Sequence, residues 1–464
     1  MQPPRQPMPE SPKHAKTLVV GRPNVLDEQG FLEDVKTILR SKLLTNGGPF
    51  VSQLEQGARE YLGVKHVVAV SNATVGLELA LRARRFAPGA EVLLPSFTFV
   101  ATAHAVACAG LTPVFCDVDE ASHFMSIASA ERATTPKTVA VVGVHLWGRA
   151  GDAAALEAFA AKRSLDVFYD SAHAFGAAYA DGAKVGTRGR AEVFSLHATK
   201  LLNGFEGGLI ATNDDALAVA ATRARNFGFS GQDTIVSMGT NAKLSEVHAA
   251  LALRHLRVVD ATLDAYRAVA ATYGDALGAA GLLDGPLTYW NAPFLRADSG
   301  CTHSYVCVRV EPAFGVSRDV VMAELRKAGV YAKRYFFPGV HAHAPYAHLA
   351  PREPGFLAAT DALNASLLVL PTGAAVAADD VARVVAELTA IHGAGRVVAD
   401  AGLAPADWDK SAYDTALATI EGERAALRAK LADLDRAEAG VRDSLALNLQ
   451  LVANVEGGKG RDKP

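Results

Sequence analysis

Lys200 is the residue of this 464-residue chain whose position best suits it for chemistry. It follows an apolar run, residues 193–196, that we interpret as a strand, and it precedes a glycine-rich turn, residues 203–208. Burial or a neighbouring positive charge lowers the pKa of a lysine. Its neutral amine then acts as a nucleophile that forms Schiff bases with carbonyl compounds. The alternative is a solvated surface lysine, because most lysines are exposed.

Asp170 ends a second apolar run, residues 166–169, and His173 follows three residues later. A carboxylate at the end of a buried strand is costly to bury without a partner, so it requires a cation or hydrogen-bond donors. The protonated nitrogen of a pyridine ring meets this requirement, and so does a helix cap or a salt bridge. The sequence leaves these partners open.

Two further strand ends carry residues suited to a flat, anionic ligand. Thr74 follows the run 66–70 and opens a helical segment, where free backbone N–H groups attract a phosphate. A plain helix cap is the alternative for Thr74. Phe99 follows the run 91–94 and is suited to stack on a planar ring, whereas a place in the hydrophobic core is its alternative.

Seven short apolar runs alternate with Ala- and Leu-rich stretches at helical spacing; the runs are residues 66–70, 91–94, 113–115, 139–144, 166–169, 193–196 and 209–211. This alternation is typical of an α/β fold with a mostly parallel sheet covered by helices on both faces. Ligands bind beyond the carboxyl ends of the strands in such sheets. We therefore expect Thr74, Phe99, Asp170 and Lys200 to converge there.

The same patterns predict four parts of the chain: a disordered leader at 1–16, a large domain at 17–275, a smaller α/β domain at 276–393, and a linker with a helical tail at 394–464. In the smaller domain we expect strands at 305–310 and 330–334 and helices at 318–328 and 378–392. Apolar residues at a 4-3 spacing between 411 and 454 form a heptad pattern. That pattern suits a coiled coil or an amphipathic helix packed on its own subunit.

Composition excludes several classes of protein. The formal net charge is −3, from 46 basic and 49 acidic residues, so no nucleic-acid or membrane partner is expected from charge. No run of about 18 apolar residues occurs, and the proline-rich start does not fit a signal peptide. The four cysteines form no CxxC pair, which favours reduced thiols. We expect a cytoplasmic protein without a metal site.

Eight stretches resemble the DegT/DnrJ/EryC1/StrS family, the sugar-aminotransferase branch of the fold-type I enzymes that use pyridoxal 5′-phosphate (PLP). They are LTNGGPFVSQLE (44–55), VAVSNATVGLELAL (68–81), LLPSFTFVATAHAVACAGLTPVFCDVD (93–119), VVGVHLWGR (141–149), YDSAHAFGA (169–177), FSLHATKLLNGFEGGLIAT (194–212), GTNAKLSEVHAAL (239–251) and AKRYFFPGVH (332–341). The resemblance covers about residues 17–393.

This resemblance implies a fold-type I PLP-dependent transferase and assigns roles around the cofactor ring. Lys200 is implied to hold PLP as a Schiff base and to move protons during catalysis. Asp170 is implied to pair with the pyridine nitrogen and Phe99 to stack on the ring. His173 lies where the family commonly has glutamine or histidine near the 3-hydroxyl group.

The resemblance also assigns the phosphate site. It implies that Ala73, Thr74 and Ser195 hold the phosphate. Asn241 lies where the family donates a residue to the phosphate site of the neighbouring subunit, which implies a homodimer with shared active sites. Members often have an S-G-T triplet where this chain has Asn72-Ala73-Thr74; alanine fits there if the backbone is helical.

The activity implied is transfer of an amino group from L-glutamate to a nucleotide-linked keto-deoxysugar through pyridoxamine phosphate. Arg334, Tyr335 and His341 are implied as substrate contacts, with Arg334 facing the nucleotide phosphates. One branch of the family has histidine in place of the lysine and dehydrates its substrate, so Lys200 favours transamination. Two alternatives remain open: an aminotransferase or dehydratase acting on a cyclitol or another non-nucleotide ketone, and a PLP-binding scaffold protein.

Overall fold

A seven-stranded sheet forms the centre of the molecule in the computed structural model, which describes residues 16–296 and 299–400. Its order is β2-β8-β7-β6-β5-β3-β4. The strands are β2 (His66–Val70), β3 (Glu91–Pro95), β4 (Thr112–Cys116), β5 (Thr138–Val144), β6 (Asp166–Asp170), β7 (Ala191–Ser195) and β8 (Gly208–Thr212). Neighbours are parallel except that β8 is antiparallel to β2 and β7. The predicted mostly parallel sheet is therefore confirmed.

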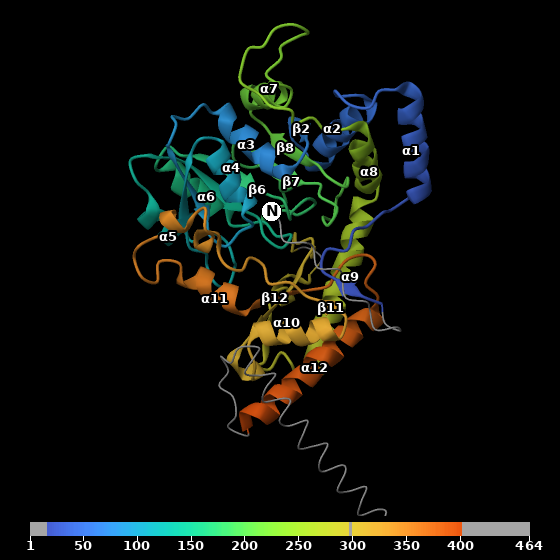
Figure 1. The fold of residues 1–464 in the computed structure, drawn as a ribbon, viewed down its shortest axis with the longest axis vertical. Coiled ribbons are helices and arrows are strands. Elements are labelled where there is room, and N and C mark those ends of the chain that lie inside the picture. Colours follow the sequence, from blue (N-terminus) through green and yellow to red (C-terminus); the bar gives the residue numbers. More distant parts are fainter. Residues whose placement is uncertain (1–15, 297–298, 401–464) are drawn as a thin grey trace, which may run out of the picture.

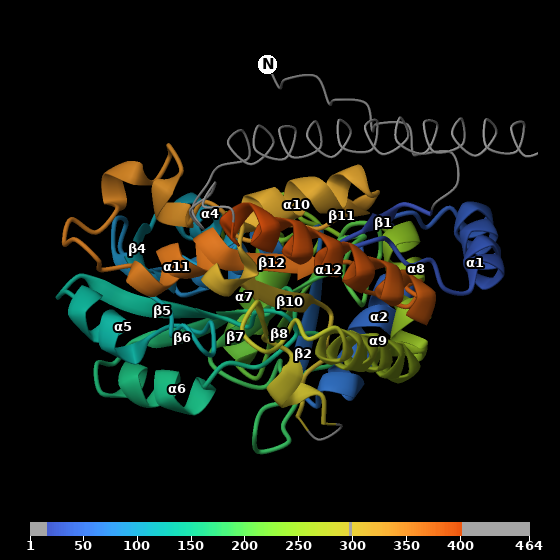
Figure 2. The same ribbon diagram turned by 90° about the horizontal axis from the view of Figure 1, so that it is seen from below.

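Helices cover both faces of this sheet (Figures 1 and 2). One face packs against α2 (Pro49–Leu62), α6 (Ala153–Ala161) and α8 (Glu246–Arg257). The other face packs against α3 (Ala73–Ala83), α4 (Ala101–Cys108) and α7 (Asp215–Ala224). Successive strand residues point to opposite faces, so Phe168 lies in one core and Tyr169 in the other. Burial on both faces is why the strands are apolar at nearly every position.

A second unit lies at one end of the large sheet, below it in Figure 1. Its three-stranded antiparallel sheet has the order β12-β10-β9 and consists of β9 (Leu287–Tyr289), β10 (Val306–Val310) and β12 (Leu367–Leu370). A separate core joins this sheet to α9 (Val259–Ala279), α10 (Arg318–Lys327) and α12 (Ala378–Asp400). A parallel pair, β1 (Leu18–Val19) and β11 (Val330–Tyr331), completes the unit.

Helix α9 connects the two units. Its 21 residues span about 30 Å at 1.5 Å per residue. Leu263 and Tyr266 belong to the core of the large sheet, whereas Tyr273 and Leu277 belong to the core of the second unit. The predicted boundary between residues 275 and 276 falls inside this helix, so both domain limits there stay a prediction.

Three local predictions differ from the structure. The pattern of residues 245–279 predicts one long helix, but the helix is interrupted at Val258, whose φ of −120° and ψ of 18° lie outside helical values. The predicted strand at 330–334 is reduced to Val330–Tyr331, because Lys333 pairs with Val369 of β12 instead. Lys16, assigned to the leader, contacts Asp380 of α12.

Some predictions fall on parts of the chain outside the described residues: the leader at 1–15 and the heptad tail beyond residue 400. The remaining helices are α1 (Glu28–Ser41), α5 (Ile127–Ala133) and α11 (Ala358–Ser366). Among residues 16–296 and 299–400, no helix combines the length and the apolar character that a membrane span requires.

Candidate active site

The carboxyl ends of β6 and β7 place Asp170 and Ser195 at one edge of the large sheet. A tight turn follows β7, in which the backbone N–H of Lys200 donates to the carbonyl of His197 at 2.8 Å. Gly208 begins β8 on the other side of this turn; a Cβ there would lie 2.7 Å from the backbone nitrogen of Ala73. The missing side chain therefore lets β8 approach the start of α3.

Lys200 directs its amine into the molecule. Its Nζ donates a hydrogen bond to the phenol oxygen of Tyr305 at 3.1 Å. Burial lowers the pKa of Lys200 to about 8; the positive charge of Lys333 acts in the same direction, and the carboxylate of Asp170 opposes both. Burial disfavours the charged amine. Lys200 is therefore not the solvated surface lysine that the sequence left open.

Asp170 receives two hydrogen bonds. Thr102 of α4 donates from Oγ1 at 2.7 Å, and the backbone N–H of Ala172 donates at 3.1 Å. Burial raises the pKa of Asp170, while these donors and the charge of Lys200 oppose the rise. The carboxylate is neither a helix cap nor part of an ion pair within the described residues, and the donors it has there are Thr102 and the N–H of Ala172.

His173 forms part of an aromatic wall beside Lys200. Its ring lies 4.3 Å from that of Tyr305 and 5.9 Å from that of the fully buried Trp147, between centroids. Burial lowers the pKa of His173 well below its usual value. Its Nδ1 is buried and has no hydrogen-bond partner. The ring is therefore neutral and carries a free polar atom.

Helix α3 begins at Ala73, and Asn72 rather than Thr74 caps it. The side chain of Asn72 accepts a hydrogen bond from the N–H of Val75 at 2.9 Å. Thr74 lies in the first turn instead. The backbone of Ala73 is helical, so alanine replaces the family's glycine without strain. The N-terminus of α3 lies against Gly208, which pairs with Ser195 at the carboxyl end of β7.

Phe99 and Ser195 occupy different parts of the edge. Phe99 is 58% exposed, so it is not the core residue that the sequence left possible. Ser195 lines a small cavity together with His173, Lys200 and Tyr305. The structure thus brings Ser195, His173 and Lys200 together around one space, with Asp170 close enough to influence the charge of Lys200.

Asn241 is exposed and accepts a hydrogen bond from Lys243 at 2.7 Å. The next residue, Ala242, accepts a hydrogen bond from the N–H of Ser71 at 2.8 Å, which ties this segment to the end of β2. Asn241 does not line the cavity around Lys200. The loop that leads to it from α7 projects away from the body of the molecule (Figure 1).

The three predicted substrate residues lie in three different settings. Arg334 pairs with Asp319 at 3.0 Å and lies 4.3 Å above the ring of Phe337. His341 is hydrogen-bonded to the hydroxyl of Ser96 at 2.7 Å. Only Tyr335 joins the aromatic wall, with its ring 6.2 Å from Tyr305 and 6.4 Å from Trp147.

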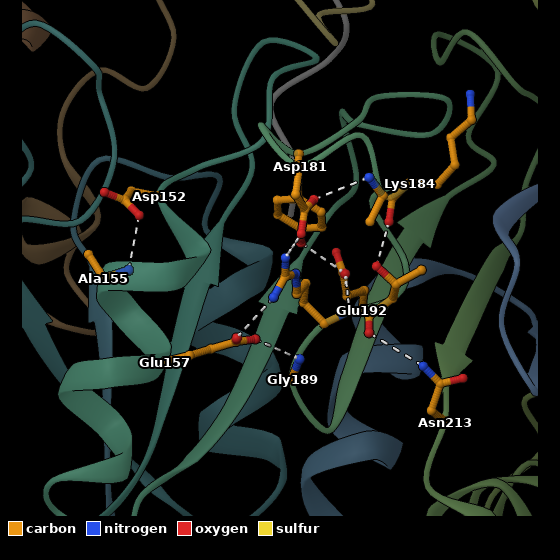
Figure 3. A network of polar contacts seen from close by, with 12 residues as sticks. Asp152, Ala155, Glu157, Asp181, Lys184, Gly189, Glu192 and Asn213 are labelled. Atoms are coloured by element: carbon orange, nitrogen blue, oxygen red, sulfur yellow. Dashed lines mark hydrogen bonds and ion pairs between the residues drawn. The ribbon is translucent and has the colours of Figure 1, made fainter.

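A buried polar network holds the end of β6 from the face opposite Asp170. Glu192 of β7 is fully buried and accepts hydrogen bonds from the hydroxyls of Ser171 and Tyr179, both at 2.9 Å, and from the N–H of Arg188 at 2.8 Å. Figure 3 shows Glu192 beside the loop that precedes β7. Because Ser171 directly follows Asp170, this network restrains the turn that carries the site.

The network extends to His145, which directly follows β5. The N–H of Gly151 donates to Nδ1 of His145 at 2.9 Å, so the ring proton lies on Nε2, 2.8 Å from the hydroxyl of Tyr179. The His145 ring also stacks on Tyr169 at 4.7 Å. Strands β5, β6 and β7 are therefore joined behind the site.

Sequence reasoning missed two residues of the site. Tyr305 directly precedes β10 and was predicted as the first residue of a strand, and Thr102 is the second residue of α4. Their partners are 105 and 68 residues away. A hydroxyl in a helix that is mostly alanine and valine was the available signal for Thr102; no comparable signal marked Tyr305.

Comparison with known proteins identifies the class. The model of the DegT/DnrJ/EryC1/StrS aminotransferase family matches residues 26–389. The chain is 33% identical over 323 residues to the dTDP-4-amino-4,6-dideoxy-D-glucose transaminase of Shigella dysenteriae, covering 70% of this chain and 85% of that protein. It is 33% identical over 347 residues to the GDP-perosamine synthase of Caulobacter vibrioides, covering 74% and 91%.

The crystal structure of DesI, determined in the presence of its TDP-sugar product, has a TM-score of 0.77 and 39% sequence identity, and the match covers 84% of this chain and 96% of that chain. The fold and the family match together define a fold-type I aminotransferase. This chain belongs to the DegT/DnrJ/EryC1/StrS aminotransferase family, whose members depend on PLP.

Proposed function

We propose that this protein uses PLP to move an amino group from L-glutamate to a nucleotide-linked keto-deoxysugar. The observation that carries the proposal is the buried amine of Lys200, with its pKa of about 8, at the same sheet edge as the Asp170 carboxylate. A PLP site requires two groups: a lysine that binds the aldehyde of the cofactor and a carboxylate that pairs with its ring nitrogen.

The residues present fit this cofactor. The Asp170 carboxylate accepts hydrogen bonds from two neutral donors. Its negative charge also suits a cationic donor. Nδ1 of His173 is a buried polar atom without a partner, suited to the ring's 3-hydroxyl group. Phe99 offers an exposed aromatic ring. The N-terminus of α3, with Ala73 and Thr74, suits a phosphate.

In this proposal Lys200 holds the cofactor's aldehyde carbon, Asp170 its ring nitrogen and Phe99 one face of the ring. Ala73, Thr74 and Ser195 hold its phosphate. When bound, PLP withdraws electrons from the substrate carbon that bears the amine and stores the amino group between the two half-reactions.

Lys200 also carries the proton. Once substrate has displaced it, its neutral amine takes a proton from the amine-bearing carbon and later returns it. A pKa near 8 keeps a substantial fraction of this amine neutral at physiological pH, whereas an ordinary lysine is almost entirely charged there. The hydroxyl of Tyr305 orients the amine through its 3.1 Å hydrogen bond.

The acceptor is proposed from the relatives. One of them is named for a dTDP-linked 4-amino-4,6-dideoxy sugar, and DesI was determined with a TDP-sugar product. A dTDP-linked 4-keto-6-deoxyglucose is therefore the first acceptor to test. Among the three predicted substrate residues, Tyr335 is the one whose ring meets Tyr305, the hydrogen-bond partner of Lys200. For Arg334 and His341 a substrate contact stays a prediction.

Mass spectrometry of products tests this function. The protein is incubated with L-glutamate and a panel of nucleotide-linked 3-keto and 4-keto sugars, with a keto-cyclitol as the non-nucleotide comparison. We expect an aminodeoxysugar and 2-oxoglutarate from a nucleotide-linked sugar. Amination of the cyclitol alone contradicts the proposed acceptor. Loss of the PLP absorption band in Lys200→Ala tests the anchor, and an intact band contradicts it.

We also propose that the protein is a homodimer whose active sites are shared. Its support is apolar surface: Phe227, Ile235, Val236 and Met238 lie in the loop that projects after α7 and are 44–83% exposed. Contiguous exposed apolar side chains indicate a protein interface. Asn241 lies at the end of this loop and is proposed to reach the partner's phosphate site.

A mixing experiment tests whether Asn241 acts across the interface. Lys200→Ala and Asn241→Ala variants are purified separately and then mixed under subunit exchange. If Asn241 serves the other subunit, each hybrid dimer contains one intact site and activity returns. If Asn241 serves its own subunit, every site keeps one defect and the mixture stays inactive.

The absence of disulfides among the four cysteines fits the cytoplasmic location that we propose.

A further inference from the structure

Lys333 is an exposed cation beside the aromatic wall. It follows β11, and its backbone exchanges two hydrogen bonds with Val369 of β12, from Lys333 N–H at 2.9 Å and to Lys333 C=O at 2.7 Å. The main chain at this position is therefore held by the sheet of the second unit. Its side chain takes no part in this backbone pairing.

The side chain extends along Tyr335. Nζ of Lys333 donates to the hydroxyl of Tyr335 at 3.3 Å and lies 5.6 Å from the centre of its ring. The Tyr335 ring meets Tyr305 edge-on at 6.2 Å, and Tyr305 accepts the hydrogen bond of Lys200. The charge of Lys333 is near enough to lower the pKa of Lys200. Lys333 is thus exposed, lies against Tyr335 and acts on the charge of Lys200 from outside the small cavity.

Neighbouring Arg334 has a different charge environment. Its guanidinium pairs with Asp319, which also accepts a hydrogen bond from Arg318 at 2.8 Å. Across the described ranges, 16–296 and 299–400, Lys333 has no carboxylate within 4.0 Å. Of these two adjacent cations, Arg334 has its counterion within the protein and Lys333 does not. An unpaired cation at the mouth of a site attracts an anionic substrate group.

We propose that Lys333 binds the diphosphate of the nucleotide-linked substrate. This inference rests on the proposed function and replaces Arg334 as the first candidate for that contact. The reacting carbon must reach Lys200 in the interior, so the diphosphate, on the far side of the sugar, lies toward the exposed rim. The ammonium group of lysine is a compact positive charge, and it has three N–H donors for phosphate oxygens.

Titration calorimetry with dTDP, and in parallel with GDP, tests this contact in the cofactor-loaded protein. Lys333→Met keeps the side-chain stem against Tyr335 and leaves the backbone pairing with Val369 intact. We expect its affinity for the nucleotides to fall about 10- to 100-fold, the effect of losing one charge-assisted hydrogen bond. Lys333→Arg should retain affinity within about threefold, because a cation suffices.

Lys162→Met is the matched control, since Lys162 is an exposed lysine at the end of α6. It should bind the nucleotides like the wild type. Unchanged affinity in Lys333→Met, or an equal loss in Lys162→Met, overturns the proposal. Failure of the wild-type protein to bind any nucleoside diphosphate overturns both this inference and the proposed acceptor.

Half-reactions distinguish the diphosphate from the other anionic substrate group, the carboxylates of glutamate. Single-turnover rates are measured at a pH at which they no longer rise with pH. They are measured first with glutamate and then with the nucleotide sugar. We expect Lys333→Met to raise the concentration of sugar required for half-maximal rate about tenfold or more and to leave the glutamate half-reaction within about twofold. A loss confined to the glutamate half-reaction assigns Lys333 to the donor and overturns the proposal.

Discussion

The amine of Lys200 and the phenol of Tyr305 lie 3.1 Å apart although 105 residues separate them in the chain. Lys200 follows β7 of the large sheet, whereas Tyr305 directly precedes β10 of the second unit. Burial raises the pKa of Tyr305 well above its usual value, so the phenol stays neutral and can accept from the charged amine or donate to the neutral one. The site is therefore completed by both units.

Replacing Tyr305 by phenylalanine removes this hydrogen bond and keeps the ring against His173. We expect the single-turnover rate with glutamate to fall about five- to tenfold, because a net hydrogen bond contributes roughly 1 kcal/mol to orienting the amine. Stopped-flow absorbance of the cofactor measures this rate. A rate equal to that of the wild type contradicts the orienting role.

Tyr289→Phe is the control for this substitution. Tyr289 is buried in the second unit, and its hydroxyl donates to the carbonyl of Ala270 at 2.6 Å. Its loss should lower the free energy of unfolding by about 1 kcal/mol without changing the half-reaction rate at saturating substrate.

The lowered pKa of Lys200 predicts the pH dependence of cofactor uptake. Only the neutral amine attacks an aldehyde, so the rate at which the apoprotein binds PLP should rise with pH and level off above about pH 8. Because the charge of Lys333 lowers this pKa, Lys333→Met should move the midpoint to higher pH. A midpoint near 10, typical of a solvated lysine, contradicts the burial of Lys200.

Thr102→Val tests the support of Asp170. Valine matches threonine in shape but removes the hydroxyl that donates to the carboxylate at 2.7 Å. The pKa of Asp170, already raised by burial, should rise further because a donor that opposes the rise is lost. We expect kcat/KM to fall about tenfold. Thr134→Val, which removes only a bond to a helix carbonyl, is the control.

Glu192→Ala tests the network behind the site by its stability. The substitution leaves the hydroxyls of Ser171 and Tyr179 and the N–H of Arg188 without their acceptor. We expect the free energy of unfolding of the apoprotein, measured with urea, to fall by about 3 kcal/mol or more. Glu60→Ala, at an exposed position of α2, should change it by about 0.5 kcal/mol or less. A loss below about 1 kcal/mol for Glu192→Ala contradicts the structural role of the network.

Deleting residues 401–464 tests whether the catalytic fold needs the tail. The family match ends at residue 389, and every side chain proposed for the site lies between Ala73 and His341. We expect the shortened protein to keep its transaminase activity within about twofold. A tenfold loss would assign the tail to the active assembly.

Local signals accounted for much of the fold. Seven of seven apolar runs became strands of the large sheet, because burial on both faces demands apolar residues along a short segment. Of the two breaks that were missed, the one after Tyr331 arises where Lys333 pairs with Val369 of the distant β12, whereas the one at Val258 falls at an exposed residue. In the candidate site, Asp170, Ser195 and Lys200 could be predicted because each lies within five residues of a strand end.

The sequence by itself determined the class of fold and the family, and it singled out Lys200 as the candidate nucleophile, because strand periodicity and motif order are properties of neighbouring residues. Only the tertiary structure decided which side chains surround that nucleophile. Lys333 and Arg334 are adjacent cations that the sequence cannot rank, yet Arg334 pairs with Asp319 of α10 while Lys333 extends along Tyr335. That difference depends on how separate segments fold together, and so does the contact between Tyr305 and Lys200.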